Sequence, residues 1–318
     1  MIVARIIMGL GNQMFQYAAA RALSLEKSTP LKVDIRSYEG YDLRKYELEK
    51  FFELQTEKAT AEEADSFYYP HPVKKTWNKI FPKNKIREYS LPFDERGIKR
   101  FLLMSYDKFY PPYKRSTYIE PHYHYDENFF STSPNVYLQG FWMSWRYFNK
   151  YEAAIRKDFT FRQNVVEHLQ SFASKLRNEN SVSLHIRRTD LTSAHVLKLK
   201  GLLPASYYEK GIRLLQSKFP DAVFYVFSDD INWVRENIHA QNAPLHFIDK
   251  AVASSAFDDF YLLSQCRHNI IANSTFSWWA AYLNSNPGKI VIAPKKWYIH
   301  PSVNCKDVFP AEWIVMDN

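Results

Sequence analysis

Hydrophobic and polar positions in the second half of the chain predict strands and helices in regular succession. From about Val165 onward, short apolar runs of strand length are separated by segments with apolar residues at helical spacing. The predicted strands are 181–186, 222–227, 245–248, 269–272 and 289–293, and the predicted helices are 165–177, 205–218, 231–238, 257–265 and 277–283. This alternation is typical of a doubly wound α/β domain.

The beginning of the chain predicts a second parallel sheet. Residues 3–8 (VARIIM) have the pattern of a strand, the turn GLGNQ follows, and NQMFQYAAARALSLEK predicts a helix with Asn12 as its N-cap. The next run, LKVDI, predicts a strand, so the order is that of a βαβ unit. Residues 38–130 are aromatic, proline-punctuated and poorly periodic, which favours helices and loops inserted before a strand at 135–141.

Together these patterns predict two Rossmann-type lobes facing a central cleft. The first lobe is expected at 1–160, with the irregular insertion 38–130, and the second at 161–318. The tail after residue 295 is expected to pack back on the first lobe. Ligands of open α/β sheets bind beyond the carboxyl ends of the strands, so candidate site residues are sought there.

Composition narrows the class of protein. The chain has 318 residues, 46% of them hydrophobic, and contains no run of about 18 apolar residues that could span a membrane. Its two cysteines, Cys266 and Cys305, are far apart and lack the spacing of zinc ligands, which argues against a disulfide framework or a zinc site. A reducing, cytoplasmic location is expected.

The net charge of +8 is concentrated in residues 71–120, which hold 12 Lys and Arg against 5 Asp and Glu, together with ten aromatic residues. Basic and aromatic residues in one segment suit a solvated face over an aromatic core, a nucleic-acid surface, or a peripheral contact with anionic lipid. A contact with the inner membrane is the partner expected here, and no nucleic acid is expected.

Two adjacent arginines follow the predicted strand 181–186 in the sequence SLHIRRTDL. Arg187, Arg188 and Asp190 are therefore expected in the turn at the carboxyl edge of the sheet. Arginine suits phosphate recognition because its planar guanidinium presents several fixed donors and keeps its charge. The alternative is a surface arginine paired with Asp190.

The sequence NSTFSWW, residues 273–279, lies between a predicted strand and a predicted helix. Small hydroxyl residues at such a turn place N–H groups and hydroxyls at a helix N-terminus, where the helix dipole favours an anion. The alternative is an ordinary Ser/Thr N-cap above buried Trp278 and Trp279.

The turn GLGNQ resembles the start of a dinucleotide fingerprint, and Asp34 follows at the distance of a ribose-binding acid. The third glycine is missing, because Met14 occupies its position. The side-chain amides of Asn12 and Gln13 are instead expected to point into the cleft and to suit sugar hydroxyls.

Paired acids allow two interpretations each. Asp229 and Asp230 in FSDD suit either a metal site or the cap of the next helix. Asp258 and Asp259 suit either the dipole of the helix they open or hydrogen bonds to a guanine base. The ten histidines show no HExxH or paired arrangement, so metal hydrolysis and histidine triads have no support.

The motifs GLGNQMFQYAAARAL, HIRRTD, FSDD and CRHNIIANSTFSWWAAYLN, in this order, resemble the bacterial-type α-1,2-fucosyltransferases of glycosyltransferase family 11 over essentially the whole chain. The resemblance implies a GT-B-like fold, GDP-fucose as donor, a galactose-terminated glycan as acceptor, inversion at the anomeric carbon, and no cofactor or divalent metal. Met8 stands where the family usually has glycine.

The resemblance also implies roles for single residues. Arg187 is expected to bind the β-phosphate and neutralise the leaving group, and Arg188 to brace its loop. The expected catalytic residues are Arg187, Asp190 and Asn12. The expected substrate-binding residues are His185, Arg188, Gly11, Gln13, Asp259, Asn273, Ser274, Thr275, Phe276 and Ser277.

The catalytic base stays open between Asp34, Asp190 and a dissociative route that needs little base assistance. Four other functions also stay open: a GDP-fucose-dependent fucosyltransferase of different linkage, an NAD-dependent dehydrogenase, a nucleic-acid-binding protein and a non-catalytic sugar-binding module.

Overall fold

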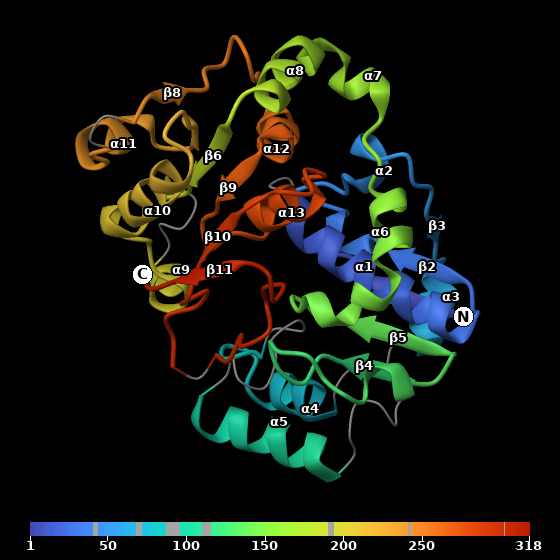
Figure 1. Ribbon diagram of the computed structural model, residues 1–318. Coiled ribbons are helices and arrows are strands. Elements are labelled where there is room, and N and C mark those ends of the chain that lie inside the picture. Colours follow the sequence, from blue (N-terminus) through green and yellow to red (C-terminus); the bar gives the residue numbers. More distant parts are fainter. Residues whose placement is uncertain are drawn as a thin grey trace. The chain divides into compact units, whose positions relative to one another are not determined.

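Two parallel β-sheets, each with its own helices, organise the chain (Figure 1). The computed structural model describes residues 1–40, 44–67, 72–86, 96–109, 116–189, 194–240, 243–301 and 303–318. Unit 1 comprises Met1–Thr160 and Ser302–Val308, and unit 2 comprises Phe161–Pro301 and Phe309–Asn318.

The sheet of unit 1 has five strands in the order β3-β2-β1-β5-β4, and all neighbours are parallel. The strands are β1 (Ile2–Arg5), β2 (Leu31–Asp34), β3 (Glu57–Lys58), β4 (Thr117–Ile119) and β5 (Val136–Gln139). Strand β1 is central, and its first three residues are buried, as expected of a strand covered on both faces.

Helix α1 (Leu10–Lys27) connects β1 to β2 and completes the predicted βαβ unit. Its run of alanines, Ala18 to Ala20, is fully buried. The N-cap is Gly9, so the prediction of Asn12 as N-cap is wrong, and Asn12 lies inside the first turn. The other helical elements are η1 (Arg36–Tyr38), α2 (Leu48–Phe51), α3 (Ala61–Phe67), α4 (Pro72–Ile80), α5 (Gly97–Phe109), η4 (Phe129–Ser131), η5 (Trp145–Tyr147), η6 (Asn149–Tyr151) and α6 (Glu152–Asp158).

The segment 38–130 contains the predicted helices, and it also contributes both edge strands of the sheet, β3 and β4, which the sequence did not indicate. Strand β3 has two exposed residues and β4 has three buried ones. Such short strands show no alternation, because period-2 patterning needs at least four or so residues to be recognised.

The sheet of unit 2 has six parallel strands in the order β11-β10-β9-β6-β7-β8. They are β6 (Ser181–Ile186), β7 (Val223–Ser228), β8 (Leu245–Phe247), β9 (His268–Ile270), β10 (Val291–Pro294) and β11 (Ile314–Met316). All six residues of β6 are buried, so both faces of this strand are covered. The doubly wound α/β prediction is confirmed.

Helices cover both faces of this sheet. They are α7 (Gln163–Val166), η7 (Glu167–Leu169), α8 (Gln170–Asn178), α9 (Ala194–Lys200), α10 (Ala205–Lys218), α11 (Ile231–Asn237), α12 (Ala256–Gln265) and α13 (Thr275–Leu283). Residues of α10 pack with Val182, Leu184 and Ile186 of β6. On the opposite face, the Asn269 amide donates to Ser183 Oγ at 2.7 Å and to the Leu263 carbonyl of α12 at 2.8 Å.

Two predictions for unit 2 need correction. The helix predicted at 165–177 is divided into α7, η7 and α8, and the sheet has β11 as an additional strand. Strand β11 is three residues long and only partly buried, so its pattern is too short to indicate a strand.

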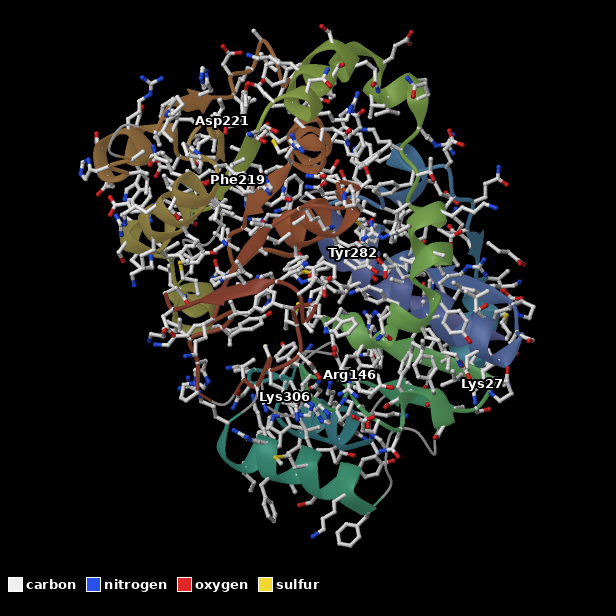
Figure 2. The ribbon with its side chains drawn as sticks, viewed as in Figure 1. Lys27, Arg146, Phe219, Asp221, Tyr282 and Lys306 are labelled. Carbon is white, nitrogen blue, oxygen red and sulfur yellow. The ribbon has the colours of Figure 1, made fainter. Side chains whose placement is uncertain are left out.

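The tail after residue 295 divides between the units. Strand β11 pairs with β10 in unit 2, whereas Ser302–Val308 belongs to unit 1. There the carboxylate of Asp307 accepts from the Tyr125 N–H at 3.1 Å and lies 3.8 Å from Arg146, which Figure 2 shows near Lys306. In the part of the chain that the structure describes, no helix combines the length and apolar character needed to cross a bilayer.

Candidate functional site

Strand β6 lies at the point where the strand order of unit 2 reverses. From β6 the chain proceeds outward to β7 and β8, then returns to the other side of β6 as β9. Connections that leave in opposite directions open a crevice at the carboxyl ends of the two strands, and ligands of open α/β sheets bind there. The segments that follow β6 and β9 carry the predicted motifs HIRRTD and NSTFSWW.

The structure brings these two motifs together. Leu184 of β6 is in register with Ile270 of β9, so the residues after the two strands are neighbours. Arg187 Nη1 donates a hydrogen bond of 2.8 Å to Ser274 Oγ. The half-buried Arg187 guanidinium is thereby directed to the N-terminus of α13, as the interpretation of a phosphate site requires.

The N-terminus of α13 is suited to hold an anion. Ser274 occupies the N-cap position, but its side chain makes no capping hydrogen bond, and its hydroxyl accepts from Arg187. The first turn contains no acidic residue. Helix N–H groups at the positive end of the dipole, with a guanidinium beside them, have the character that suits phosphate oxygens.

Arg188 takes a different direction from Arg187. Its guanidinium carbon lies 3.7 Å from the centroid of the Trp233 ring on α11, and its Nε lies 3.9 Å from the Asp230 carboxylate. These contacts suit the role expected of Arg188, which is to brace its loop. They also engage the Arg188 guanidinium, which was predicted to bind substrate as well. Alternate side chains after a strand point to opposite sides, which separates the two arginines.

The acids of FSDD hold the arginine loop and cap a helix. The Asp229 carboxylate accepts from the N–H groups of Arg188 and Thr189, at 2.8 and 3.0 Å, and from the Thr189 hydroxyl at 2.8 Å. Asp230 caps α11 by accepting from the Trp233 N–H at 3.1 Å. The capping interpretation of this motif is therefore confirmed for Asp230. Asp190 lies outside the described residues.

Aromatic rings adjoin the turn at the N-terminus of α13. The ring of His185, on β6, lies 5.7 Å from that of Phe276, on α13, and Phe276 lies 5.1 Å from Phe260 on α12. Phe276 is half-buried, whereas its neighbours Thr275 and Ser277 are buried. A half-buried ring beside an anion site offers a surface on which a nucleotide base can stack.

The neighbouring acids Asp258 and Asp259 have different surroundings. Asp258 closes a capping box with Ser255 and also accepts from the Ser254 N–H and hydroxyl, each at 2.8 Å. Burial, and then the charge of Asp258, raise the pKa of Asp259 to about 7. Among the described residues no hydrogen bond or ion pair reaches the Asp259 carboxylate. Asp259 is thus the acid of this pair that can accept hydrogen bonds from a ligand.

Two predicted binding residues of unit 2 are structural. The Asn273 amide donates to the Lys200 and Gly201 carbonyls at 3.1 and 3.3 Å and is 2% exposed. The Ser277 hydroxyl is buried and donates back to the Ala272 and Ser274 carbonyls at 3.5 and 3.3 Å. These side chains hold the turn in place, and their contact with substrate stays a prediction.

Gln13 also differs from its prediction. Its amide nitrogen donates to the Met8 and Lys45 carbonyls at 3.0 and 2.8 Å, and its amide oxygen accepts from the Glu47 N–H at 2.9 Å. The side chain is fully buried and fastens residues 45–47 to α1, so it does not point outward. Gly11 is buried in the first turn of α1, and Asn12 is half-buried there, at the carboxyl end of β1.

Met8 has a backbone conformation that favours glycine. Its φ is +71°, and its side chain is 44% exposed. The Met8 carbonyl accepts from the Gln13 amide at 3.0 Å and from the Tyr38 hydroxyl at 2.8 Å, which holds the turn in this left-handed conformation. A glycine at this position would adopt the same turn without steric cost.

Asp34 is unsuited to act as a base. Its carboxylate accepts from Arg36 Nε and Nη2 at 3.0 and 2.9 Å and from the Tyr137 hydroxyl at 2.8 Å. Burial alone would raise the pKa of Asp34, but these hydrogen bonds together outweigh it and lower the pKa. Asp34 therefore orders the carboxyl end of β2, and the interpretations as base or ribose-binding acid lose their support.

A histidine pair that was not predicted from the sequence lies just after β4. The rings of His122 and His124 are stacked with centroids 3.6 Å apart, and burial, then the neighbouring His124, lower the pKa of His122. His122 is therefore uncharged at neutral pH. The spacing HxH was visible in the sequence, but without a predicted strand before it the pair had no assigned place.

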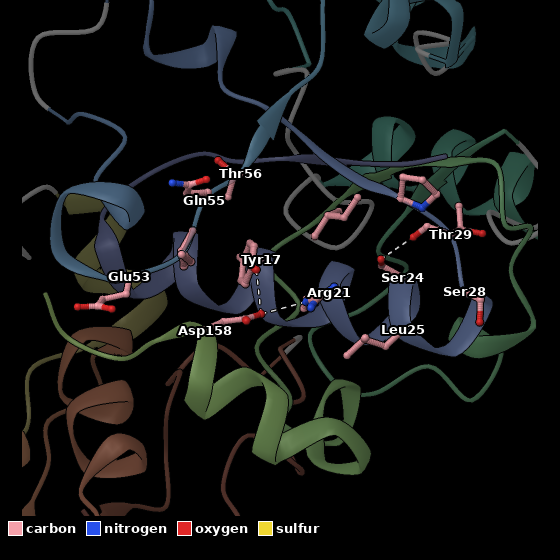
Figure 3. A pocket seen from close by; sticks show the side chains of 13 residues that line it. Tyr17, Arg21, Ser24, Leu25, Ser28, Thr29, Glu53, Gln55, Thr56 and Asp158 are labelled. Carbon is pink, nitrogen blue, oxygen red and sulfur yellow. Dashed lines mark hydrogen bonds and ion pairs between the residues drawn. The ribbon is translucent and has the colours of Figure 1, made fainter.

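A separate hollow of about 660 Å³ in unit 1 contains none of the predicted site residues. Figure 3 shows its wall, where Tyr17 and Arg21 of α1 donate to the Asp158 carboxylate at 2.9 and 3.0 Å. Leu31, the first residue of β2, also lines it, so the hollow adjoins the amino ends of the strands. Because Arg21 is paired with Asp158, the chemistry here differs from that of the Arg187 site.

The sequence matches the model for "Glycosyl transferase family 11" over residues 97–317. It is 34% identical to an "Alpha-1,2-colitosyltransferase" of Escherichia coli, over 98% of both chains. It is 32% identical to the "O-antigen biosynthesis glycosyltransferase WbnK" of Escherichia coli, over 91% of this chain and 92% of the other. The rat "Galactoside alpha-(1,2)-fucosyltransferase 2" is 34% identical over 46% of this chain and 44% of its own.

Among solved structures, the chain is similar to the NodZ α-1,6-fucosyltransferase co-crystallised with GDP. The TM-score is 0.52 and the sequence identity 16%, with 92% of this chain and 94% of the other covered. This similarity supports the GT-B-like fold that the sequence motifs implied, with its two parallel α/β sheets.

Proposed function

The chain belongs to glycosyl transferase family 11, and from this we propose that it transfers L-fucose from GDP-fucose to the 2-hydroxyl of a terminal β-galactoside in a surface glycan. The observation that carries the proposal is the Arg187–Ser274 pair at the uncapped N-terminus of α13. The diphosphate of GDP would bind there. His185, Phe276 and Asp259 would surround the guanosine, with Asp259 accepting from the guanine N1–H and 2-amino groups.

Charge development explains how this site would act. As the bond between fucose and the β-phosphate breaks, negative charge grows on the phosphate while the sugar becomes oxocarbenium-like. A guanidinium and helix N–H groups fixed in advance stabilise this charge more in the transition state than in the ground state. Arg187 and α13 thus do, in the proposal, what a divalent cation does in other nucleotide-sugar enzymes, and no cofactor is required.

Transfer would proceed with inversion, because the acceptor hydroxyl attacks the anomeric carbon opposite the departing GDP. Asn12 is proposed to orient the acceptor. Asp190 remains the predicted base. A strongly dissociative transition state would need little help from a base.

The relative named as a colitosyltransferase favours a second donor. Colitose is fucose without the 3-hydroxyl, so both GDP-sugars would present the same nucleotide and diphosphate to the residues described above. Discrimination would then depend on contacts with the 3-hydroxyl. A donor pocket with a hydrogen bond to that hydroxyl would prefer GDP-fucose strongly, since a lost buried partner is costly.

The test is to incubate the pure protein with GDP-fucose or GDP-colitose and a panel of β-galactosides, with EDTA present, and to determine the linkage by NMR. An α-1,2-linked product supports the proposal, and the ratio of kcat/KM values identifies the donor. Binding of GDP-fucose without consumption would instead indicate a sugar-binding module. A product of another linkage would contradict the assigned acceptor hydroxyl.

A further inference from the structure

Helices α4 and α5 expose large apolar side chains to solvent. Phe109 is 85% exposed, Phe101 69%, Ile98 63% and Met104 50% on α5, and Ile80, at the end of α4, is 61% exposed. At 100° per residue, the four residues of α5 fall on one side of the helix, while Leu103 on the other side is fully buried. The structure therefore defines an apolar α4–α5 surface, made of these five residues and Phe81.

The two helices that carry this surface are held together by specific contacts. Figure 1 shows α4 and α5 side by side. Trp77 of α4 packs on Phe81 with ring centroids 4.5 Å apart and donates from its indole nitrogen to the Asn84 carbonyl at 2.8 Å. Lys99 of α5 donates to the Asn84 side chain at 2.8 Å and lies 5.6 Å from the Trp77 ring. The apolar residues are thus presented by an ordered pair of helices.

The two helices of the α4–α5 surface also carry an excess of positive charge. Residues 72–86 and 96–109 contain nine Lys and Arg and a single acid, Asp107. Lys75, Lys79 and Lys83 are exposed beside α4, and Lys108 is exposed on α5 next to Phe109. An apolar face bordered by cations complements a surface that is apolar inside and negatively charged outside.

We propose that the α4–α5 surface docks on the anionic face of a lipid bilayer, with its phenylalanines inserted below the headgroups and its lysines against the phosphates. Binding of this kind grows with the apolar area inserted and with each cation near the surface. Docking would hold the enzyme beside a glycan that is built on a membrane lipid, and this consequence rests on the proposed function. The docking itself is independent of the proposed function.

The composition of the surface favours a bilayer over single-stranded RNA. RNA-binding surfaces use aromatic rings, on which bases stack. Ile80, Ile98 and Met104 are aliphatic, are at least half exposed, and offer no face for stacking. Aliphatic and aromatic side chains together with lysine are instead the composition of helices that lie in the membrane interface.

The test is sedimentation of the full chain with vesicles of phosphatidylglycerol and phosphatidylcholine, compared with phosphatidylcholine alone. We expect binding to the anionic vesicles that weakens with salt. Phe101→Ser combined with Phe109→Ser should weaken binding at least tenfold, and Lys79→Glu with Lys83→Glu should do the same. Ile299→Ser and Lys218→Glu, exposed positions of unit 2, are matched controls that should bind as the wild type does.

The variants should keep the thermal unfolding temperature and the turnover of a soluble acceptor, since none of the substituted residues belongs to the candidate site. Vesicle binding by the phenylalanine variant equal to wild type would overturn the proposal. So would wild-type self-association through these residues without vesicle binding, or an RNA oligonucleotide that displaces the vesicles. If the wild-type protein itself shows no turnover of a soluble acceptor, that result would count against the proposed function and not against the docking.

Discussion

At the scale of single residues, neighbours in the sequence have separate functions. Arg187 reaches Ser274 on one side of β6, and Arg188 lies against Trp233 on the other. The Asp258 carboxylate is engaged in its capping box, whereas the Asp259 carboxylate can accept hydrogen bonds from a ligand. The sequence motif identifies the pair in each case, and the side of the strand or helix on which each member lies decides which one can meet substrate.

Arg187→Ala should reduce kcat by about 10²–10³ with the fold intact, which is the effect of removing one donor from a preorganised anion site. Arg187→Lys should also be poor, because an ammonium cannot reproduce the planar guanidinium. Steady-state kinetics and thermal unfolding measure both effects. Arg213→Ala, an exposed arginine of α10, is the matched control. An Arg187→Ala variant with more than a tenth of the wild-type rate would contradict the assignment.

GDP should bind more weakly as the pH falls from 8 to 6. Because burial raises the pKa of Asp259 to about 7, the carboxyl is mostly ionised at pH 8 and mostly protonated at pH 6, and only the ionised form accepts from both guanine donors. The change in Kd should be about tenfold. Calorimetry of wild type and Asp259→Asn measures the change. The variant should lose the part of the pH dependence that comes from Asp259 and keep the part that comes from titration of the GDP phosphate. Equal pH dependence in the two proteins would remove Asp259 from the guanine site.

Met8→Gly should stabilise unit 1. The left-handed φ of +71° costs a non-glycine residue about 1–2 kcal/mol, part of which the greater backbone entropy of glycine cancels. A net gain of about 1 kcal/mol or less should raise Tm by about 1–3 °C. Met8→Ala keeps the strain and serves as control, with Tm unchanged or lower. Since both variants lack the methionine side chain, a lower Tm for Met8→Gly than for Met8→Ala would show that glycine relieves no net strain at this turn and would contradict the prediction.

At the scale of elements, adjacency of strands creates the candidate site. The motifs that follow β6 and β9 are separated by more than 80 residues, and parallel pairing of these strands places Arg187 and Ser274 within a hydrogen bond. The loop after β6 is fastened from the other neighbour, β7, by Asp229. The site is therefore a property of three adjacent strand ends.

Turnover should change less than about twofold between EDTA and added Mg²⁺. The oxygens of Asp229 and Asp230 are engaged with the 188–189 backbone and the α11 N-terminus, and Arg187 supplies the positive charge that a cation would bring. Asp229→Asn should lower turnover by loosening the loop, and Mg²⁺ should not rescue it. Strict dependence of turnover on a divalent cation would contradict this prediction and support the interpretation of FSDD as a metal site.

At the scale of the whole molecule, two parallel α/β sheets on one chain agree with family membership and with the GT-B-like fold. The turn GLGNQ in unit 1, which suggested a dehydrogenase, leads into a helix whose Gln13 is turned inward and whose neighbouring Asp34 is paired with Arg36. Neither residue is available to hold a dinucleotide, and the proposed anion site lies in unit 2.

GDP should therefore raise Tm, and NAD should not. A ligand present at 100 times its Kd stabilises the folded state by about 2.7 kcal/mol. Thermal unfolding with GDP, ADP and NAD measures this, and ADP serves as the control for the diphosphate without guanine. A shift with NAD and none with GDP would reverse the assignment to a nucleotide-sugar enzyme.

The sequence by itself determined the architecture and the edge of the sheet at which the candidate motifs lie. Long, regular strand–helix alternation from residue 181 to 293 specifies the parallel sheet of unit 2, and motifs at strand ends lie at the carboxyl edge by the geometry of such sheets. The short strands β3, β4 and β11 were not predicted, because two or three residues carry no periodicity.

Only the tertiary structure decided which motif residues are available to a ligand. Gln13, Asn273 and Ser277 have the same side chains that binding sites use, but each is consumed by backbone groups that folding brings close. The physical reason is that a buried polar group must find a partner, and a sequence does not show whether that partner is the protein or the substrate.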